Sequence, residues 1–223
     1  MQTAATPRLS ASSYSNTAPL VWSFLYGSRR GKYELILDTA PARSAELLAQ
    51  KRVDAALVPV IAYQTIDDAL LVPDVCVGAR ERVRSVCLVT KGEDLKDVKK
   101  VALDVSSKTS VALTKIIFRE FLGFEPEYQN AKPDVTEMLA AADCALIIGD
   151  PALVIADSGF GVADLERTKT KNQKPKTENQ LRKFDLVEVW KSFTGGGFVF
   201  AMWMANAEKT EAARTIDLSA ARD

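Results

Sequence analysis

The 223-residue sequence contains no histidine. Histidine is the commonest general base near neutral pH and a common metal ligand, so its absence removes both options from the chemistry of the chain. The sequence also has no nucleophile elbow, no glycine-rich dinucleotide fingerprint, no P-loop and no paired-carboxylate motif. The sequence therefore lacks the motifs that are typical of oxidoreductases and hydrolases, and no motif predicts a metal ion or a cofactor.

Cysteine is scarce, and long apolar runs are missing. Cys76, Cys87 and Cys144 lie far apart in apolar segments, and their odd number and spacing predict neither a disulfide framework nor a zinc site. We expect them to be small buried hydrophobic residues in a reducing compartment. The first residues lack the apolar core of a signal peptide, and no run is long enough to cross a bilayer. These absences predict a cytoplasmic protein.

Net charge is also missing, because 29 basic residues balance 29 acidic ones. A neutral chain has no overall field that attracts nucleic acid or an anionic membrane, so neither is expected as a partner. Any anion site must then be built locally. The composition, 47% hydrophobic and 26% charged, is that of a globular protein with a core. The oligomeric state stays open, a dimer included.

Hydrophobic periodicity predicts strands and helices in alternation. The predicted strands are 8–13, 33–38, 54–60, 70–77, 85–90, 101–104, a segment at Tyr128 and 144–148. Residues 198–204 are either a buried strand or the start of a crossover. The predicted helices are 18–26, 42–50, 111–121 and 134–142, and residues 184–190 form a strand and the start of a helix. This alternation favours parallel sheets with crossover helices in two α/β lobes, with a ligand cleft between them.

We assign residues 7–90 and 198–223 to the first lobe and residues 91–197 to the second. Residues 168–183 are polar and basic, which predicts a solvated loop, with a functional basic patch as the alternative. Gly195, Gly196 and Gly197 predict a flexible turn. The tail from residue 205 is expected to begin a helix that is cut short.

Hydrogen-bonding side chains cluster where predicted strands give way to helices. Ser13, Tyr14, Asn16 and Thr17 follow the first strand and precede a helix whose free N–H groups favour an anion. The alternative is simple capping, with Thr17 as the cap. A second hydroxyl-rich loop, with Ser106, Ser107, Thr109 and Ser110, repeats the arrangement in the second lobe. Two such loops predict a ligand with two anionic ends.

Other polar residues border the predicted strands. Asp150 follows a buried strand and either caps the next helix or points into the cleft. Arg84 and Ser85 precede the strand at 85–90. We count these residues as candidate substrate-binding groups.

Six segments occur in order between Arg8 and Trp203: RLSASSYSNTAPLVWSF, DAALVPVIAYQ, RSVCLVTK, ALDVSSKTSVALTKI, CALIIGDPAL and FVFAMW. As a set they resemble the chorismate dehydratase family of the futalosine pathway of menaquinone biosynthesis. The resemblance implies a periplasmic-binding-protein-like fold of the second type and a cytoplasmic hydro-lyase. Its reaction would convert chorismate to 3-[(1-carboxyvinyl)oxy]benzoate and water.

The resemblance also implies roles for single residues. Asn16 matches the asparagine of the family motif SYLNTxP and would lie close to the reacting centre. Ser85, Ser107, Thr109 and Ser110 would bind carboxylates. Ser15 stands where the family usually has leucine. Family members continue past the FVFAMW segment, so we expect the C-terminal helices of the first lobe to be missing.

Three other interpretations stay open. The same fold serves solute-binding proteins that bind small carboxylates without chemistry. A sibling enzyme of the pathway, the dihydroxynaphthoate synthase, has a different N-terminal motif and relies on a histidine. A degraded lyase would bind chorismate but turn it over poorly.

Overall fold

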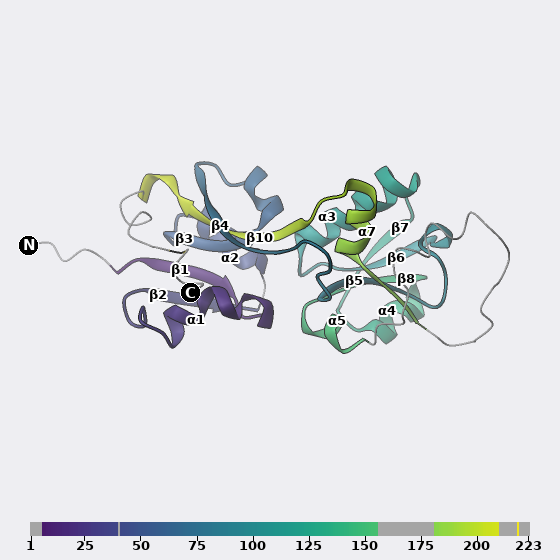
Figure 1. Ribbon diagram of the computed structural model, residues 1–223, viewed down its shortest axis with the longest axis horizontal. Coiled ribbons are helices and arrows are strands. Elements are labelled where there is room, and N and C mark those ends of the chain that lie inside the picture. The colour runs from purple at the N-terminus through teal and green to yellow at the C-terminus, as the bar shows by residue number, and fades with distance from the viewer. Residues whose placement is uncertain (1–5, 40, 156–180, 210–217, 219–223) are drawn as a thin grey trace, which may run out of the picture. The chain divides into compact units, whose positions relative to one another are not determined.

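The computed structural model describes residues 6–39, 41–155, 181–209 and 218. The chain divides into two compact units, one made of residues 1–78, 106–109 and 199–223 and the other of residues 79–105 and 110–198. Each unit has its own five-stranded sheet (Figure 1). The class is therefore α/β with two mixed sheets.

The sheet of the first unit has the strand order β2-β1-β3-β10-β4. Its strands are β1 (Arg8–Ser12), β2 (Glu34–Asp38), β3 (Ala55–Pro59), β4 (Ala69–Ala79) and β10 (Phe198–Asn206). β1 pairs in parallel with β2 and β3, whereas β10 runs antiparallel to β3. The prediction of parallel pairing is confirmed for β1, β2 and β3 but not for β10, which returns to this sheet from the far end of the chain.

Helices α1 (Ala18–Leu25) and α2 (Pro41–Ala49) contribute to two hydrophobic clusters of the first unit. Strand β10 contributes residues to both clusters. Its Trp203 packs with residues of α1, and the next residue, Met204, packs with residues of α2. Successive side chains of a strand point to opposite faces, so the two clusters lie on opposite faces of the sheet. Short 3-10 turns follow β1, β3 and β10, namely η1 (Ser15–Thr17), η2 (Val60–Gln64) and η5 (Ala207–Lys209).

The sheet of the second unit has the order β7-β6-β8-β5-β9. Its strands are β5 (Val86–Thr90), β6 (Lys100–Asp104), β7 (Glu127–Ala131), β8 (Cys144–Ile148) and β9 (Arg182–Asp185). β6 pairs in parallel with β7 and β8, and β5 runs antiparallel to β8 and β9. Residues 79–90, which the sequence placed in the first lobe, therefore belong to the second unit. The apolar pattern of β5 is compatible with either sheet. Its pairing with β8 and β9 assigns it to the second unit.

Within the described ranges, the helical segments of this unit are η3 (Leu95–Asp97), α3 (Lys108–Ile116), the π-helical turn η4 (Ile117–Leu122), α4 (Val135–Ala141), α5 (Asp150–Val154) and α7 (Leu186–Thr194). Residues 108 and 109, the first two of α3, are grouped with the first unit. Asp134 caps α4, since its carboxylate accepts hydrogen bonds from Thr136 N at 2.9 Å and Glu137 N at 3.0 Å. The interpretation of residues 134–142 as a helix that Asp134 caps is confirmed.

Some local predictions need correction. Cys87 and Cys144 are buried, and burial raises the pKa of the Cys144 thiol, but Cys76 is exposed on β4. Arg182 and Lys183, expected in the basic loop, lie in β9. Lys183 is buried and donates hydrogen bonds to Ala152 O and Ile155 O. The rest of that loop up to residue 180 lies outside the described residues, as does most of the C-terminal tail.

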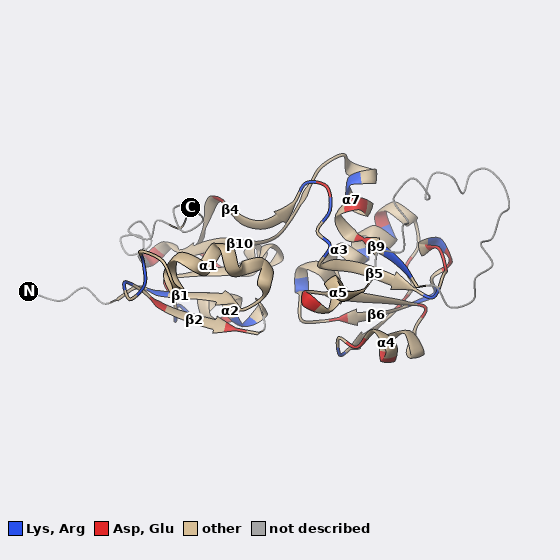
Figure 2. Cartoon of the chain, turned by 60° about the horizontal axis from the view of Figure 1, so that its bottom comes forward, with Lys and Arg blue, Asp and Glu red and all other residues tan. Residues whose placement is uncertain are grey.

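Charged residues of both signs occur in each unit (Figure 2). This distribution agrees with the balanced composition and gives neither unit a charge of one sign. Among the described residues, no helix combines the length and the apolar character that a membrane crossing requires.

Candidate functional site

In the first unit, the polar segment after β1 forms a 3-10 turn that leads directly into α1. Ser13 N donates a hydrogen bond to Asp38 O at 2.8 Å, which ties the segment to the end of the parallel neighbour β2. Ser13 and Asn16 are exposed, and Tyr14 is half-buried. The side chain of Asn16 is therefore open to a ligand.

Thr17 plays a different part from the one expected. It occupies the N-cap position of α1, but its side chain caps no helix N–H group. Its buried hydroxyl instead lies 2.6 Å from Ser12 O and 2.7 Å from Tyr14 O, so its one proton is directed to carbonyl oxygens of the turn. The expectation that Thr17 caps α1 through its side chain is wrong, and the hydroxyl stabilises the turn that carries Asn16.

In the second unit, Ser85 and Asp150 lie at one edge of the sheet. The parallel strands β6 and β8 end at the same edge, where the antiparallel β5 begins. Ser85 precedes β5 and Asp150 follows β8, and Gly149 N donates a hydrogen bond to Ser85 O at 2.7 Å. The structure thus brings the Ser85 and Asp150 segments together, as strand order alone could not predict.

The hydroxyl-rich segment after β6 leads into α3, and residues 106–109, which the sequence places in the second lobe, are grouped with the first unit. Ser106 and Ser107 are half-buried and precede the helix, whereas Thr109 and Ser110 are buried in its first turn. The first N–H groups of an α-helix have no partner within the helix, and the helix dipole favours an anion there. Hydroxyl and N–H donors therefore accompany one another in this segment.

Asp150 is the first residue of α5, and the N-cap is Gly149 with φ 68°. Of the two interpretations of Asp150, the one in which it caps this helix is wrong. Its side chain is exposed. Gly149 reaches a left-handed φ that glycine tolerates without a steric penalty, which turns the chain sharply between β8 and α5.

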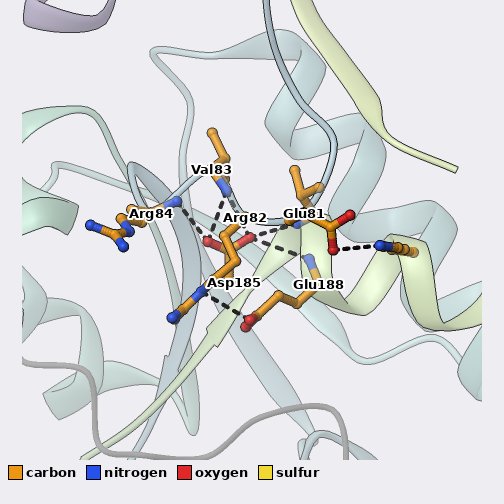
Figure 3. Close-up of polar contacts among 8 residues, drawn as sticks. Glu81, Arg82, Val83, Arg84, Asp185 and Glu188 are labelled. Atoms are coloured by element: carbon orange, nitrogen blue, oxygen red, sulfur yellow. Dashed lines mark hydrogen bonds and ion pairs between the residues drawn. The ribbon is translucent and has the colours of Figure 1, made fainter.

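Val83 and Arg84 are held by Asp185, a residue that the sequence pattern does not point to (Figure 3). The buried Asp185 carboxylate accepts hydrogen bonds from Arg84 N at 2.6 Å and from Val83 N at 3.0 Å. It also accepts one from Val187 N at 2.9 Å, as the N-cap of α7. The position of Asp185 before a predicted helix start would have indicated a cap, but no local signal links it to residues 83–84.

Apart from Asp150, whose carboxylate only accepts hydrogen bonds, the candidate residues share one kind of chemistry. They offer hydroxyl groups, a side-chain amide, backbone N–H groups and the guanidinium of Arg84, all of which donate hydrogen bonds to anionic or leaving oxygen atoms. Within the described ranges, no cluster of carboxylate and thiol side chains is arranged to hold a metal ion. These donors suit a ligand that carries carboxylates and hydroxyls.

The fold places the chain in a known class. A protein from Archaeoglobus fulgidus matches with a TM-score of 0.62 at 11% identity, over 98% of this chain and 82% of that chain. The periplasmic aliphatic sulphonate binding protein SsuA from Escherichia coli matches with a TM-score of 0.56 at 14% identity, over 97% of this chain and 72% of that chain. At such identities the likeness shows the fold alone, and the periplasmic-binding-protein-like class is confirmed.

The sequence defines the family within that class. The sequence model of the menaquinone biosynthesis family matches residues 7–222, and the chain belongs to this family. A chorismate dehydratase from Thermus thermophilus is 38% identical over 138 residues, which make up 61% of this chain and 48% of that protein. The chain therefore spans about half the length of the curated relative it matches. The resemblance drawn from the six segments is confirmed.

Proposed function

We propose that the chain is a chorismate dehydratase, a hydro-lyase that converts chorismate to 3-[(1-carboxyvinyl)oxy]benzoate and water in the futalosine pathway of menaquinone biosynthesis. The observation that carries the proposal is family membership across residues 7–222, in a chain 38% identical to a chorismate dehydratase over 138 residues. The hydrogen-bond donors among the candidate residues support it, because the substrate presents two carboxylates and a leaving hydroxyl.

The reaction does not require a strong base from the protein. A proton leaves one ring carbon, the electrons of that C–H bond enter the ring, and the neighbouring hydroxyl leaves to complete water. Aromatisation of the ring drives this step, so orientation and charge stabilisation are the main tasks of the protein. We propose that a substrate carboxylate accepts the ring proton and passes it to the departing hydroxyl, which leaves as water. This route accounts for a chain without histidine.

Asn16 is the proposed catalytic residue. It lies exposed on η1, and its side-chain amide can donate a hydrogen bond to the departing hydroxyl. The internal hydrogen bonds of Thr17 fix the turn that carries it. The proposed substrate-binding residues are Ser13, Tyr14, Thr17, Arg84, Ser85, Ser106, Ser107, Thr109, Ser110 and Asp150.

Variants at Asn16 test the assignment. Asn16→Ala removes the amide, and Asn16→Asp replaces its donor with an acceptor of similar shape. We expect each to lower kcat for chorismate by about 10²-fold, the usual cost of removing a donor from a developing oxyanion. The measurement is the steady-state rate of product formation followed by ultraviolet absorbance.

Gln50→Ala is the control, because Gln50 is an exposed amide side chain just after α2, and it precedes the start of β3 at the opposite edge of the first sheet from η1. It should leave kcat unchanged. Near-normal turnover by the Asn16 variants would rule out the catalytic role. Saturable chorismate binding by the wild-type chain without any product would instead indicate a binding protein of the same fold.

A further inference from the structure

Asp185 makes more hydrogen bonds than a helix cap needs. One oxygen of its carboxylate accepts from Val187 N at 2.9 Å and from Glu188 N at 3.3 Å, which is ordinary capping of α7. The other oxygen accepts from Val83 N at 3.0 Å and Arg84 N at 2.6 Å. These two donors belong to a segment about a hundred positions earlier in the chain, so capping does not explain them.

The segment that Asp185 holds has a strained backbone. Arg84 has φ 60°, in the left-handed region that residues with a Cβ atom adopt at a steric cost. Such a conformation persists only where surrounding contacts over-determine it. Here Ser85 N also donates to Val83 O at 2.7 Å, and Gly149 N donates to Ser85 O at 2.7 Å. Together with the two bonds to Asp185, these contacts fix the backbone of residues 83–85.

The charged neighbours of Arg84 are already engaged. The Arg82 guanidinium lies 2.9 Å from a Glu188 carboxylate oxygen, and Lys191 pairs with Glu81. Arg84 is exposed, its side chain points away from the Asp185 carboxylate, and it forms no ion pair with any residue of the described ranges (Figure 3). The buried carboxylate therefore binds the Arg84 backbone and leaves its guanidinium for another anion.

We propose that Asp185 is a positioning residue, which fixes the backbone of residues 83–85 so that Arg84 presents its guanidinium to a carboxylate of the substrate. The inference rests on the proposed function, because it takes chorismate as the ligand. A guanidinium binds a carboxylate with two parallel hydrogen bonds, which require a defined approach. Loss of Asp185 releases the backbone, and the guanidinium then has to be ordered when substrate binds.

Asp185→Ser is the variant of choice, and Asp134→Ser is its matched control. Serine caps helices about as well as aspartate, but it has one side-chain oxygen and cannot serve both sets of donors. Asp134 caps α4 through the same pattern of bonds to Thr136 N and Glu137 N. We expect Asp185→Ser to raise KM for chorismate about tenfold with little change in kcat, and Asp134→Ser to change neither. Asp185→Asn serves as a second variant should Asp185→Ser fail to fold.

A double-mutant cycle with Arg84→Ala separates positioning from a general effect on folding. If Asp185 acts through Arg84, the double variant has the same KM as Arg84→Ala alone. Additive increases in KM, or a KM for Asp185→Ser equal to that of the Asp134→Ser control, would overturn the inference.

Amide hydrogen exchange gives a readout that does not depend on turnover. Exchange at Val83 and Arg84 should accelerate in Asp185→Ser and stay at the wild-type rate in Asp134→Ser. Unchanged exchange at both amides would refute the positioning role, whether or not chorismate is converted. A wild-type chain that fails to convert chorismate would instead refute the proposed function, and with it the role of Arg84 toward that substrate.

Discussion

At the scale of single residues, the fold changes the pKa of the phenol of Tyr128 on β7. Its oxygen is buried and finds no hydrogen-bond partner among the described residues. Burial, with a smaller contribution from Glu125, raises the pKa of Tyr128 from 10.0 to about 12. The native state therefore keeps this proton at a pH at which the unfolded state loses it.

This shift predicts a pH dependence of stability. Between about pH 10 and 12 the native state binds more protons at Tyr128 than the unfolded state, so the free energy of unfolding falls as pH rises. Tyr128→Phe should remove this part of the decline. At neutral pH the variant should match or slightly exceed wild-type stability, because it deletes a buried hydroxyl without a partner. Urea unfolding followed by circular dichroism at several pH values measures both, and an equally steep alkaline decline in the variant would contradict the account.

Single residues also show how much of the candidate site can be predicted from the sequence. The polar segments around Asn16 and Ser107 could be found from the sequence, because they are local clusters that follow strands. The sequence does not determine the partner of the Thr17 hydroxyl, since a threonine before a helix can bond either to helix N–H groups or to preceding carbonyls, as it does here. Asp185 was missed altogether, because its bonds to residues 83–84 depend on tertiary structure.

At the scale of elements, three successive glycines after α7 differ in backbone conformation and in the space available for a Cβ atom. Gly195 is the C-cap of α7 with φ 75°, a left-handed conformation that favours glycine. A Cβ atom on Gly196 would meet only Thr194 Oγ1 at 3.8 Å. A Cβ atom on Gly197 would lie 2.6 Å from Ala79 O, where the backbone would have to shift. The sequence predicts a turn here but does not distinguish these roles.

Alanine at each of these positions should therefore have a graded effect. Gly196→Ala serves as the control and should leave stability nearly unchanged. Gly195→Ala should lower the free energy of unfolding by about 1–2 kcal/mol, the cost of a left-handed residue with a Cβ atom. Gly197→Ala should cost more, because the contact is with backbone. Thermal and urea unfolding of the three variants test the order, and equal stabilities would refute these assignments.

At the scale of the whole molecule, periodicity predicted most strands and helices close to their observed bounds, because each has a local apolar pattern. It did not predict which sheet a strand joins. β5 was assigned with the strands before it, but it pairs with β8 and β9 of the second unit. β10 enters the first sheet antiparallel to β3 after the whole second unit has intervened. Such pairings depend on contacts between distant segments, which a single sequence does not display.

The central claim about the whole molecule is that it dehydrates chorismate, and it rests on the family to which the chain belongs. The direct test incubates the purified 223-residue chain with chorismate and identifies the products by mass spectrometry. The account predicts saturable conversion to 3-[(1-carboxyvinyl)oxy]benzoate, lighter than chorismate by one water, at a rate proportional to the concentration of the chain. Unchanged chorismate after incubation with a folded wild-type chain would contradict it.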